Sequence, residues 1–276
     1  MAVAAARAVE SSRPDRLVED PFAEAFVRAA PTPRPLPTRW PDDLAALTDQ
    51  QVLLLLGANY VGLRTRFFDD ALADPGRQVV LLAAGLDTRA FRLAWPAGTT
   101  AYELDQPEVP AFKDSVLTAP PRCTRVPVPV DLAGDWATPL RAAGFDPGTP
   151  TAWLAEGLLH YLDADAERAL VDTVDRLSAP GSTLTVERAM TVPDRQALED
   201  GSDRLGVRMD EIVHTGPRTD LTTTLRDRGW TAEDIPADTV ATRYGRPLPH
   251  PDLVRARAGG AAQPTQAGFT RAEKTG

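Results

Sequence analysis

Short apolar runs bounded by glycine or proline recur through the middle of the chain. The run 78–83 follows Pro75-Gly76 and ends at Gly85, and continuous apolar runs of this length are typical of buried strands. Segments at 99–104, 125–130, 151–155 and 182–187 also read as strands. Segments with helical spacing of apolar residues alternate with them, at 88–93, 107–117, 136–143 and 164–177. This alternation predicts a mostly parallel sheet covered by helices on both faces, the doubly wound α/β class.

Helical spacing also dominates the residues before the first predicted strand. Asp20-Pro21 pairs a good N-cap with a proline at the first helical position, which predicts a short helix there. The pattern from 42 to 73 predicts two further helices, separated near Thr48-Asp49. Five prolines between Pro31 and Pro41 favour an extended connection, which we interpret as a linker or the strap of a lid. We therefore expect residues 1–74 to form a helical N-terminal lid.

The pattern becomes less regular after the fifth predicted strand. Residues 220–228 read as a helix stopped by Gly229, and 230–235 and 239–244 as two antiparallel edge strands, which brings the sheet to seven strands. Little periodicity follows Arg255, so we expect 255–276 to be a flexible tail. The core domain is expected to span 75–254.

Composition narrows the class of protein. Of 276 residues, 43% are hydrophobic and 25% charged, as in ordinary globular proteins. The net charge of −9 makes a nucleic-acid partner improbable, because such proteins need a basic surface. A single cysteine, Cys123, allows no internal disulfide, and no apolar run approaches the roughly 20 residues of a membrane span. The three histidines have no metal-ligand spacing. We expect a cytoplasmic protein with no metal and no membrane partner; the sequence does not predict an oligomeric state.

Candidate chemistry lies where the predicted strands end, because ligands bind beyond the carboxyl ends of parallel strands. The turn from Ala83 to Gly85 could bring backbone close to a ligand, although an ordinary tight turn would have the same sequence. Asp105 follows Gly85 by 20 residues, a spacing at which an acidic residue commonly binds a ribose diol. The alternative is that Asp105 or Gln106 caps the helix opening at Pro107.

Two later strand ends and one helix add further candidates. Asp131 and Leu132 could contact an adenine ring, and Glu156, beside Gly157, could pair with a ligand ammonium group. Arg64, on the helix before the first strand, could clamp a carboxylate, or could be a solvated arginine beside Arg66 and Asp69. His160 is a candidate base, but its apolar neighbours favour a packed or locally hydrogen-bonded side chain.

Taken together, these segments resemble the leucine carboxyl methyltransferase family and its bacterial branch of S-adenosyl-L-methionine-dependent O-methyltransferases. The resemblance spans about residues 10 to 250, and the combination of GLDTR with ELDQP is specific. The matching stretches are RPDRLVEDPFAEAFV at 13–27, RTRFFDD at 64–70, LLAAGLDTRAFRL at 81–93, YELDQPEV at 102–109, Asp131-Leu132, AEGLLHYL at 155–162 and RYGRP at 243–247.

The resemblance implies a Rossmann-like fold and S-adenosyl-L-methionine as cofactor. It assigns the methionine carboxylate to Arg64 and the methionine portion to the backbone from Ala83 to Gly85. It assigns the ribose to Asp105, and the amino end or the surroundings of the sulfonium to Glu156. The adenine falls to Asp131 and Leu132. No residue is assigned as catalytic.

The sequence departs from the family pattern at two positions. Ala83 stands where the family usually has glycine, which is harmless to a backbone contact unless φ must be positive. His160 stands where the family often has methionine, so no role is carried onto it.

The expected reaction is O-methylation of a carboxylate, or of a hydroxyl, on a small-molecule acceptor, with secondary metabolism as its setting. A carboxylate is already ionised at neutral pH, so its methylation needs no general base. A segment at about 190–217 would form the acceptor pocket. Two alternatives remain: a nicotinamide-dependent oxidoreductase, which the G-x-G-x-x-G glycines missing around Gly85 disfavour, and a catalytically inactive cofactor-binding scaffold.

Overall fold

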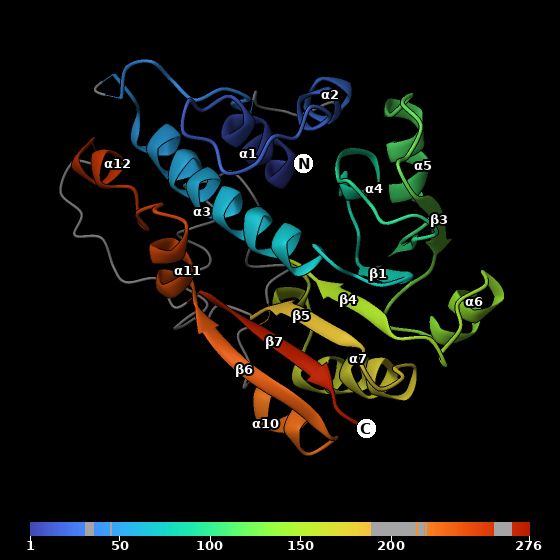
Figure 1. The fold of residues 1–276 in the computed structure, drawn as a ribbon. Coiled ribbons are helices and arrows are strands. Elements are labelled where there is room, and N and C mark those ends of the chain that lie inside the picture. Colours follow the sequence, from blue (N-terminus) through green and yellow to red (C-terminus); the bar gives the residue numbers. More distant parts are fainter. Residues whose placement is uncertain (31–35, 45, 189–213, 215–217, 219, 257–266) are drawn as a thin grey trace.

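The computed structural model of the chain describes residues 1–276 apart from 31–35, 45, 189–213, 215–217, 219 and 257–266 (Figure 1). Its centre is a seven-stranded sheet in the order β3-β2-β1-β4-β5-β7-β6. All neighbouring pairs are parallel except those of β7, which runs antiparallel to both β5 and β6. The predicted doubly wound α/β fold is therefore confirmed.

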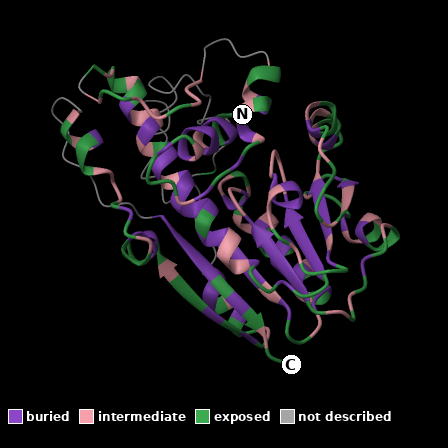
Figure 2. Ribbon diagram, turned by 45° about the horizontal axis from the view of Figure 1, so that its top comes forward, coloured by how far each residue is buried: buried purple, intermediate pink, exposed green. Residues whose placement is uncertain are grey.

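The first five strands lie within about one residue of their predicted bounds. Four of them are mostly buried because helices cover both faces of the sheet, as the purple strands in Figure 2 show, whereas the edge strand at 124–129 is only partly buried. The strands are β1 (Gln78–Leu82), β2 (Thr100–Asp105), β3 (Thr124–Pro129), β4 (Thr151–Ala155) and β5 (Thr183–Glu187).

Two hydrophobic cores flank the sheet. On one face Val80 and Leu82 pack in a cluster with residues of α6 (Ala137–Ala142), α7 (Ala164–Arg176) and α10 (Leu221–Arg226). On the other face Val79 and Leu81 pack with residues of α3 (Asp49–Ala71) and α11 (Ala237–Arg243). Successive residues of β1 thus face opposite cores, as the pleat of a strand requires. The remaining helices between strands are α4 (Arg89–Arg92) and α5 (Glu108–Val116).

The N-terminal residues form α1 (Ala2–Ser11), α2 (Ala23–Ala29) and the long α3 (Figure 1). The prediction of two helices between 42 and 73 is wrong, because the described residues between 42 and 48 form no helix. Thr48 instead caps α3: its side chain accepts from the Gln51 backbone, and the Gln51 side chain accepts from the Thr48 backbone. The predicted break is therefore the start of a single helix.

The Asp20 carboxylate accepts a hydrogen bond of 3.0 Å from the Phe22 backbone nitrogen, as an N-cap residue does, but the predicted start of the helix is wrong. The helix α2 begins only at Ala23, with Phe22 at the N-cap position. The Asp20 carboxylate lies 2.8 Å from the Arg7 Nε atom and accepts a hydrogen bond of 2.8 Å from the Thr88 hydroxyl. Asp20 thereby links α1 to the turn that follows β1.

The C-terminal predictions need two corrections. Residues 239–244 are not a strand, since 237–243 form α11. The prediction of a flexible tail is also wrong. After α12 (Pro251–Ala256), the strand β7 (Gly268–Lys274) lies between β5 and the edge strand β6 (Trp230–Pro236). Phe269 is fully buried and stacks on Phe67 with ring centroids 4.3 Å apart. The strand is ordered because its apolar side chains complete the core beneath α3.

The predicted acceptor-pocket segment lies almost wholly outside the described residues. Apart from His214, the segment at 190–217 lies outside them. Within the part of the chain that the structure describes, no helix is long and apolar enough to cross a membrane.

Candidate functional site

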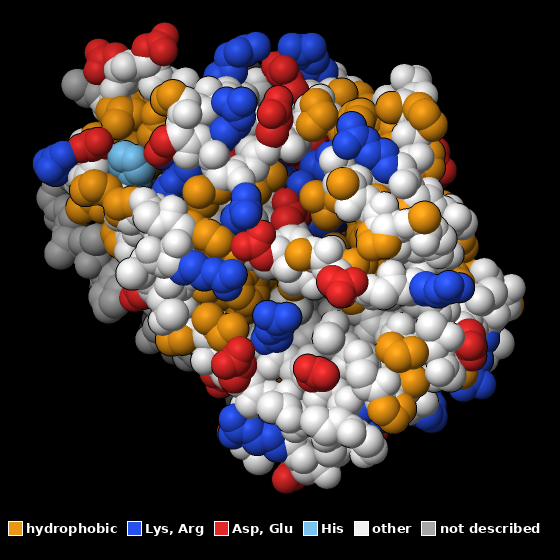
Figure 3. Space-filling model, viewed as in Figure 1, with side chains coloured by type: hydrophobic (Ala, Val, Ile, Leu, Met, Phe, Trp, Pro, Cys, Tyr) orange, Lys and Arg blue, Asp and Glu red, His pale blue; other side chains and the backbone are white. Residues whose placement is uncertain are grey.

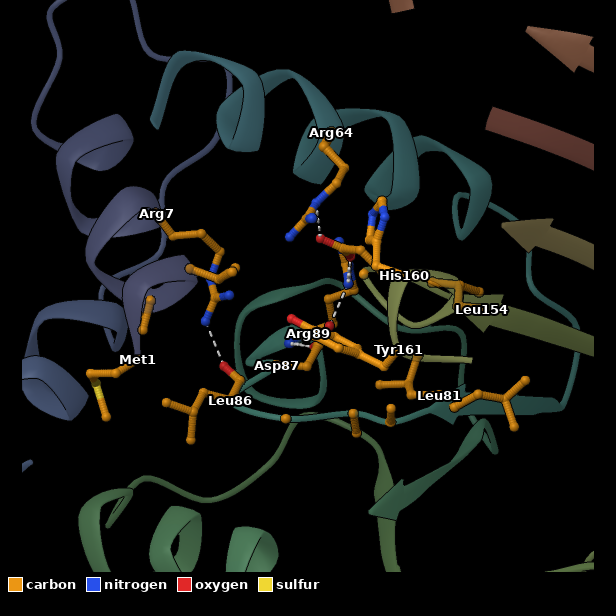
Figure 4. A pocket seen from close by; sticks show the side chains of 18 residues that line it. Met1, Arg7, Arg64, Leu81, Leu86, Asp87, Arg89, Leu154, His160 and Tyr161 are labelled. Carbon is orange, nitrogen blue, oxygen red and sulfur yellow. Dashed lines mark hydrogen bonds and ion pairs between the residues drawn. The ribbon is translucent and has the colours of Figure 1, made fainter. Parts of the chain in front are cut away.

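The strand order reverses between β1 and β4, with β2 and β3 on one side and β5 on the other. Ligands of doubly wound sheets bind at such a reversal, beyond the carboxyl ends of the strands. A cavity of about 290 Å³ opens there, lined by the first turns of α1, by Arg64 of α3, by residues 81–87 and Arg89, and by residues that follow β4 (Figure 4). Four sequence-predicted site residues line it: Arg64, Ala83, Gly85 and Glu156.

The turn after β1 has an unusual backbone. Ala83 has a φ of +52° and Gly85 a φ of +51°, both in the left-handed region that favours glycine. The departure from the family glycine at Ala83 is therefore not neutral, because the position does require a positive φ. A Cβ atom on Gly85 would meet only the Ala83 carbonyl oxygen, at 3.9 Å, so space beside this glycine is open.

Asp105 is fixed against this turn. Its Oδ2 atom accepts from the Gly85 backbone nitrogen at 2.6 Å, and its Oδ1 atom accepts from the Gln106 backbone nitrogen at 2.8 Å. No side chain caps the helix that follows, so the capping alternative for Asp105 and Gln106 is wrong. The carboxylate ties the end of β2 to the Gly85 turn.

Arg64 lies in the protein interior, with 7% of its surface exposed. Its Nε atom lies 2.9 Å from Glu156 Oε1, and its Nη1 atom donates to Glu187 Oε2 at 2.8 Å. The alternative of a solvated arginine is therefore wrong. The Nη2 atom has no partner among the described residues, and Figure 4 shows the guanidinium at the α3 side of the cavity. This nitrogen is a donor available to a ligand carboxylate.

Glu156 connects Arg64 to a second buried arginine. The Oε2 atom of Glu156 lies 2.8 Å from Arg89 Nη1, and Arg89 also pairs with Asp69 and Asp87. Burial raises the pKa of Asp87, but the positive charges of Arg89, Lys113 and Arg92 outweigh burial and lower that pKa to about 2. Asp87 is therefore ionised at neutral pH.

Glu187 is a site residue that the sequence reasoning missed. Its carboxylate is buried and accepts from Arg64, from the Tyr60 hydroxyl at 2.7 Å and from the Gly157 backbone nitrogen at 2.7 Å. Burial raises its pKa, but the charge of Arg64, the nearby His160 and the hydrogen bond from Tyr60 outweigh burial and lower that pKa to about 2. Glu187 ends β5 as Glu156 follows β4, so the rule of strand ends could have found it.

Arg7 and Arg89 were missed as well. Arg89 belongs to the GLDTR stretch that supports the family resemblance, but nothing in that stretch alone marks it as a partner of Glu156. Arg7 comes from α1, and its contacts with Asp20 and with the Leu86 carbonyl oxygen depend on tertiary structure. No local pattern marks such a contact.

Asp131 and Leu132 do not line the cavity. Asp131 is exposed, and its Oδ1 atom accepts from the Ala133 backbone nitrogen at 2.9 Å. Leu132 packs partly against the core. Both follow β3, next to the strand that carries Asp105. His160 does line the cavity, and its Nε2 atom lies 4.0 Å from Glu187 Oε1.

The charges of the site fit a ligand that is cationic overall and also carries a carboxylate. The ion-pair network around Arg64 and Arg89 contains four carboxylates and three guanidinium groups. The carboxylates belong to Asp69, Asp87, Glu156 and Glu187, and the guanidinium groups to Arg64, Arg89 and Arg92. The surplus is one negative charge, while Arg64 keeps a free donor. Figure 3 shows acidic and basic side chains interspersed over the face of the molecule that it presents. S-adenosyl-L-methionine, with a sulfonium, an ammonium and one carboxylate, has the matching charges.

A metal is a weaker fit to the described residues. No group of three or more His, Cys, Asp or Glu side chains within the described ranges is arranged to hold an ion. The acids of the cavity are instead engaged by arginines.

Comparisons with known proteins agree with this fit. A protein named "Putative S-adenosyl-L-methionine-dependent methyltransferase" from Mycolicibacterium gilvum is 47% identical over 267 residues, covering 90% of this chain and 86% of its own. One with the same description from Streptomyces coelicolor is 46% identical over 261 residues, covering 90% and 86%. A solved structure of a duf574 family protein from Streptomyces avermitilis shares the fold, with a TM-score of 0.55 at 13% identity, covering 98% of this chain and 96% of that one.

The family comparison covers the part of the chain that holds most of the site. The family described as leucine carboxyl methyltransferase matches residues 1–175, which include α1, Arg64, the Ala83 to Gly85 turn and Glu156. The predicted resemblance is confirmed: the chain belongs to the leucine carboxyl methyltransferase family.

Proposed function

We propose that this chain is an S-adenosyl-L-methionine-dependent O-methyltransferase that esterifies a carboxylate of a small-molecule acceptor, with a hydroxyl as the second candidate. Methyltransferase activity with this cofactor follows from family membership. The oxygen acceptor and the residue roles rest on the geometry of the cavity. We further propose secondary metabolism as the setting, as expected from the sequence.

Each end of the cofactor has a matching group in the proposed site. The Nη2 atom of Arg64 would receive the methionine carboxylate, and Glu156 would face the ammonium or the sulfonium. The backbone from Ala83 to Gly85 would run along the methionine portion. Asp105 would accept from the ribose hydroxyls, and Asp131 with Leu132 would contact the adenine, since these residues follow the adjacent strands β2 and β3.

The reaction places modest demands on the protein. The cofactor supplies an activated methyl group: the acceptor oxygen forms the new bond, the sulfur–methyl bond breaks, and its electron pair stays on sulfur. A carboxylate nucleophile carries no proton, so the chain has only to align the reactants and exclude water. The buried ion pairs of Arg64 and Arg89 hold the side chains of the cavity wall in place, which helps to align the reactants.

The observation that carries this proposal is the Arg64–Glu156–Arg89 network at the reversal of the sheet. Burying a charged group is costly unless it is paired. Here two arginines share one carboxylate, while one guanidinium nitrogen of Arg64 faces the cavity without a partner among the described residues. Such an arrangement is expected of a site prepared for a zwitterionic ligand.

The test is transfer of a radiolabelled methyl group from S-adenosyl-L-methionine to a panel of carboxylic acids and phenols. Alkali releases the label from methyl esters as methanol, whereas aryl methyl ethers are stable to the same treatment. We expect base-labile product from carboxylic acids. Label found only in base-stable products of phenols would contradict the carboxylate assignment, and tight cofactor binding with no transfer would favour the inactive-scaffold alternative.

We also propose that the N-terminal helices act as a lid over the cofactor. Residues of α1 line the cavity, and the Nη2 atom of Arg7 donates to the Leu86 carbonyl oxygen at 2.5 Å. Limited proteolysis with and without cofactor tests the lid. Protection of the Pro31 to Pro41 segment by cofactor would support it, and unchanged cleavage would contradict it.

A further inference from the structure

The exposed large apolar side chains gather at one place. Among the described residues they are Met1 at 37%, Val3 at 40% and Tyr161 at 50% exposure, and all three line the cavity. Apolar side chains left exposed beside a pocket commonly contact a ligand. We call these three residues the apolar rim.

The groups proposed for the adenosine do not share the cavity lining with the apolar rim. Figure 4 shows Met1 on the α1 side of the cavity and Tyr161 on the side that follows β4. Asp105, Asp131 and Leu132 follow β2 and β3 and are not in the cavity lining. The adenine ring would therefore not occupy the apolar rim, which leaves the rim to the methyl acceptor.

Arg7 adds a charged donor next to the rim. It is 8% exposed; its Nε atom lies 2.8 Å from Asp20 Oδ2, and its Nη2 atom donates to the Leu86 carbonyl oxygen. These two contacts fix the plane of the guanidinium. The Nη1 atom has no partner among the described residues. An oriented guanidinium donor of this kind binds a carboxylate well.

We propose, on the basis of the function proposed above, that the acceptor is a carboxylic acid with an apolar alkyl or aryl body. The body lies against Val3 and Tyr161, between α1 and the 3₁₀ turn η1 (Leu159–Tyr161). One carboxylate oxygen accepts from Arg7 Nη1, and the other is left to take the methyl group. No proton moves in this step, because the carboxylate enters the cavity ionised.

A hydroxyl acceptor fits these observations less well. It would carry a proton that a base has to remove, and it would gain less from a guanidinium than a carboxylate does. A small, fully polar acid would leave the apolar rim uncovered. The combination of a free guanidinium donor and an apolar rim therefore selects an amphiphilic acid.

Calorimetric titrations of the full chain saturated with S-adenosylhomocysteine test this assignment. The probes are acetate, hexanoate, 3-phenylpropanoate and hexanamide. Hexanoate and 3-phenylpropanoate should bind at least about tenfold more tightly than acetate, since each buried methylene group adds to affinity. Hexanamide, which has the same tail without the charge, should bind at least about tenfold more weakly than hexanoate.

Two variants localise the effect to the apolar rim. Val3→Ser combined with Tyr161→Ser should abolish the advantage of hexanoate over acetate and leave the affinity for S-adenosylhomocysteine within about twofold. The matched control Tyr161→Phe should keep the advantage. Equal binding of acetate and hexanoate by the unmodified chain, or a chain-length advantage that survives the double substitution, would overturn the acceptor class. Failure to bind S-adenosylhomocysteine would overturn the proposed function, and the acceptor class with it.

Discussion

At the scale of single residues, Ala83 shows how the structure changes the meaning of a substitution. Its φ of +52° places an alanine where the family pattern has glycine. The left-handed conformation costs a non-glycine residue about 1–2 kcal/mol in the folded state. Part of this cost is offset because the unfolded chain has less conformational entropy with alanine than with glycine. Ala83→Gly should therefore raise the free energy of unfolding by up to about 1 kcal/mol, measured by urea denaturation.

The adjacent residue provides the control for Ala83. Among the described residues other than glycine, Ala83 is the one with positive φ, so Ala84 has no such strain. Ala84→Gly should lower stability by about 0.5–1 kcal/mol, because glycine loses more backbone freedom on folding. Equal destabilisation by both substitutions would show that Ala83 is not strained in solution.

Asp105 carries the most direct prediction about cofactor affinity. Asp105→Ala should weaken S-adenosyl-L-methionine binding by about 1.5–3 kcal/mol, since it removes hydrogen bonds to a charged acceptor. Part of the loss would come from the turn, because Gly85 also donates to this carboxylate. Glu108→Ala is the control, since Glu108 is an exposed acid three residues away with no role in the cavity. Unchanged affinity in Asp105→Ala, by calorimetry, would refute the ribose assignment.

Glu187 makes stability depend on pH in a defined direction. Its pKa is lowered from 4.5 to about 2 in the folded chain, so its ionised form stabilises the fold above about pH 4.5. That contribution is lost as the pH falls from 4.5 towards 2. Glu187→Gln should cost about 3–5 kcal/mol at pH 7, because Arg64 loses a buried partner.

The difference between the wild-type chain and Glu187→Gln should narrow as the pH falls from 5 to 3, when followed by urea denaturation at each pH. Glu233→Gln, at an exposed position on β6, is the control and should be neutral throughout. A difference that stays constant with pH would mean that Glu187 keeps an ordinary pKa in the folded chain.

At the scale of secondary-structure elements, β7 is the feature that the sequence conceals. Phe269 is fully buried against Phe67 and Phe68, whereas Arg271 on the same strand is exposed. Phe269→Ala should destabilise the chain by about 3–5 kcal/mol, as loss of a buried phenyl ring usually does. Arg271→Ala should change stability by less than about 0.5 kcal/mol. A neutral Phe269→Ala in thermal unfolding would restore the prediction of a flexible tail.

The elements differ in how far local pattern could predict them. The strands β1 and β4 are nearly continuous apolar runs, and β2, β3 and β5 were predictable because they alternate regularly with segments of helical spacing. By contrast, β7 mixes apolar and charged residues, and it pairs with β5, a strand about 80 residues earlier in the sequence, so no local pattern reports the pairing. The sequence 237–243 could be strand or helix by propensity, and packing of Val240 and Ala241 against the second core decides for helix.

The site residues also differ in how far local sequence pattern could predict them. Strand ends located Ala83, Gly85, Asp105 and Glu156, because parallel strands bring their carboxyl ends to one edge of the sheet. The partner of Arg64 could not be located this way, since Glu187 lies 123 residues further along the chain. Arg7 depends on the docking of α1, which the alanine-rich start of the chain does not reveal.

At the scale of the whole molecule, the fold places one cavity between two kinds of wall. The sheet contributes the turn after β1 and Glu156, which follows β4, while α1 and α3 contribute Arg7 and Arg64 (Figure 4). A ligand in the cavity therefore bridges the N-terminal helices and the sheet. Binding should consequently stabilise the docking of those helices as well as the site itself.

The central claim is that this cavity binds S-adenosyl-L-methionine, and calorimetric titration of the full chain tests it most directly. The ligands are S-adenosyl-L-methionine, S-adenosylhomocysteine and NADH, measured against the wild-type chain under one set of conditions. We predict micromolar binding of the first two and none of NADH. Binding of NADH alone, or of none of the three, would contradict the account.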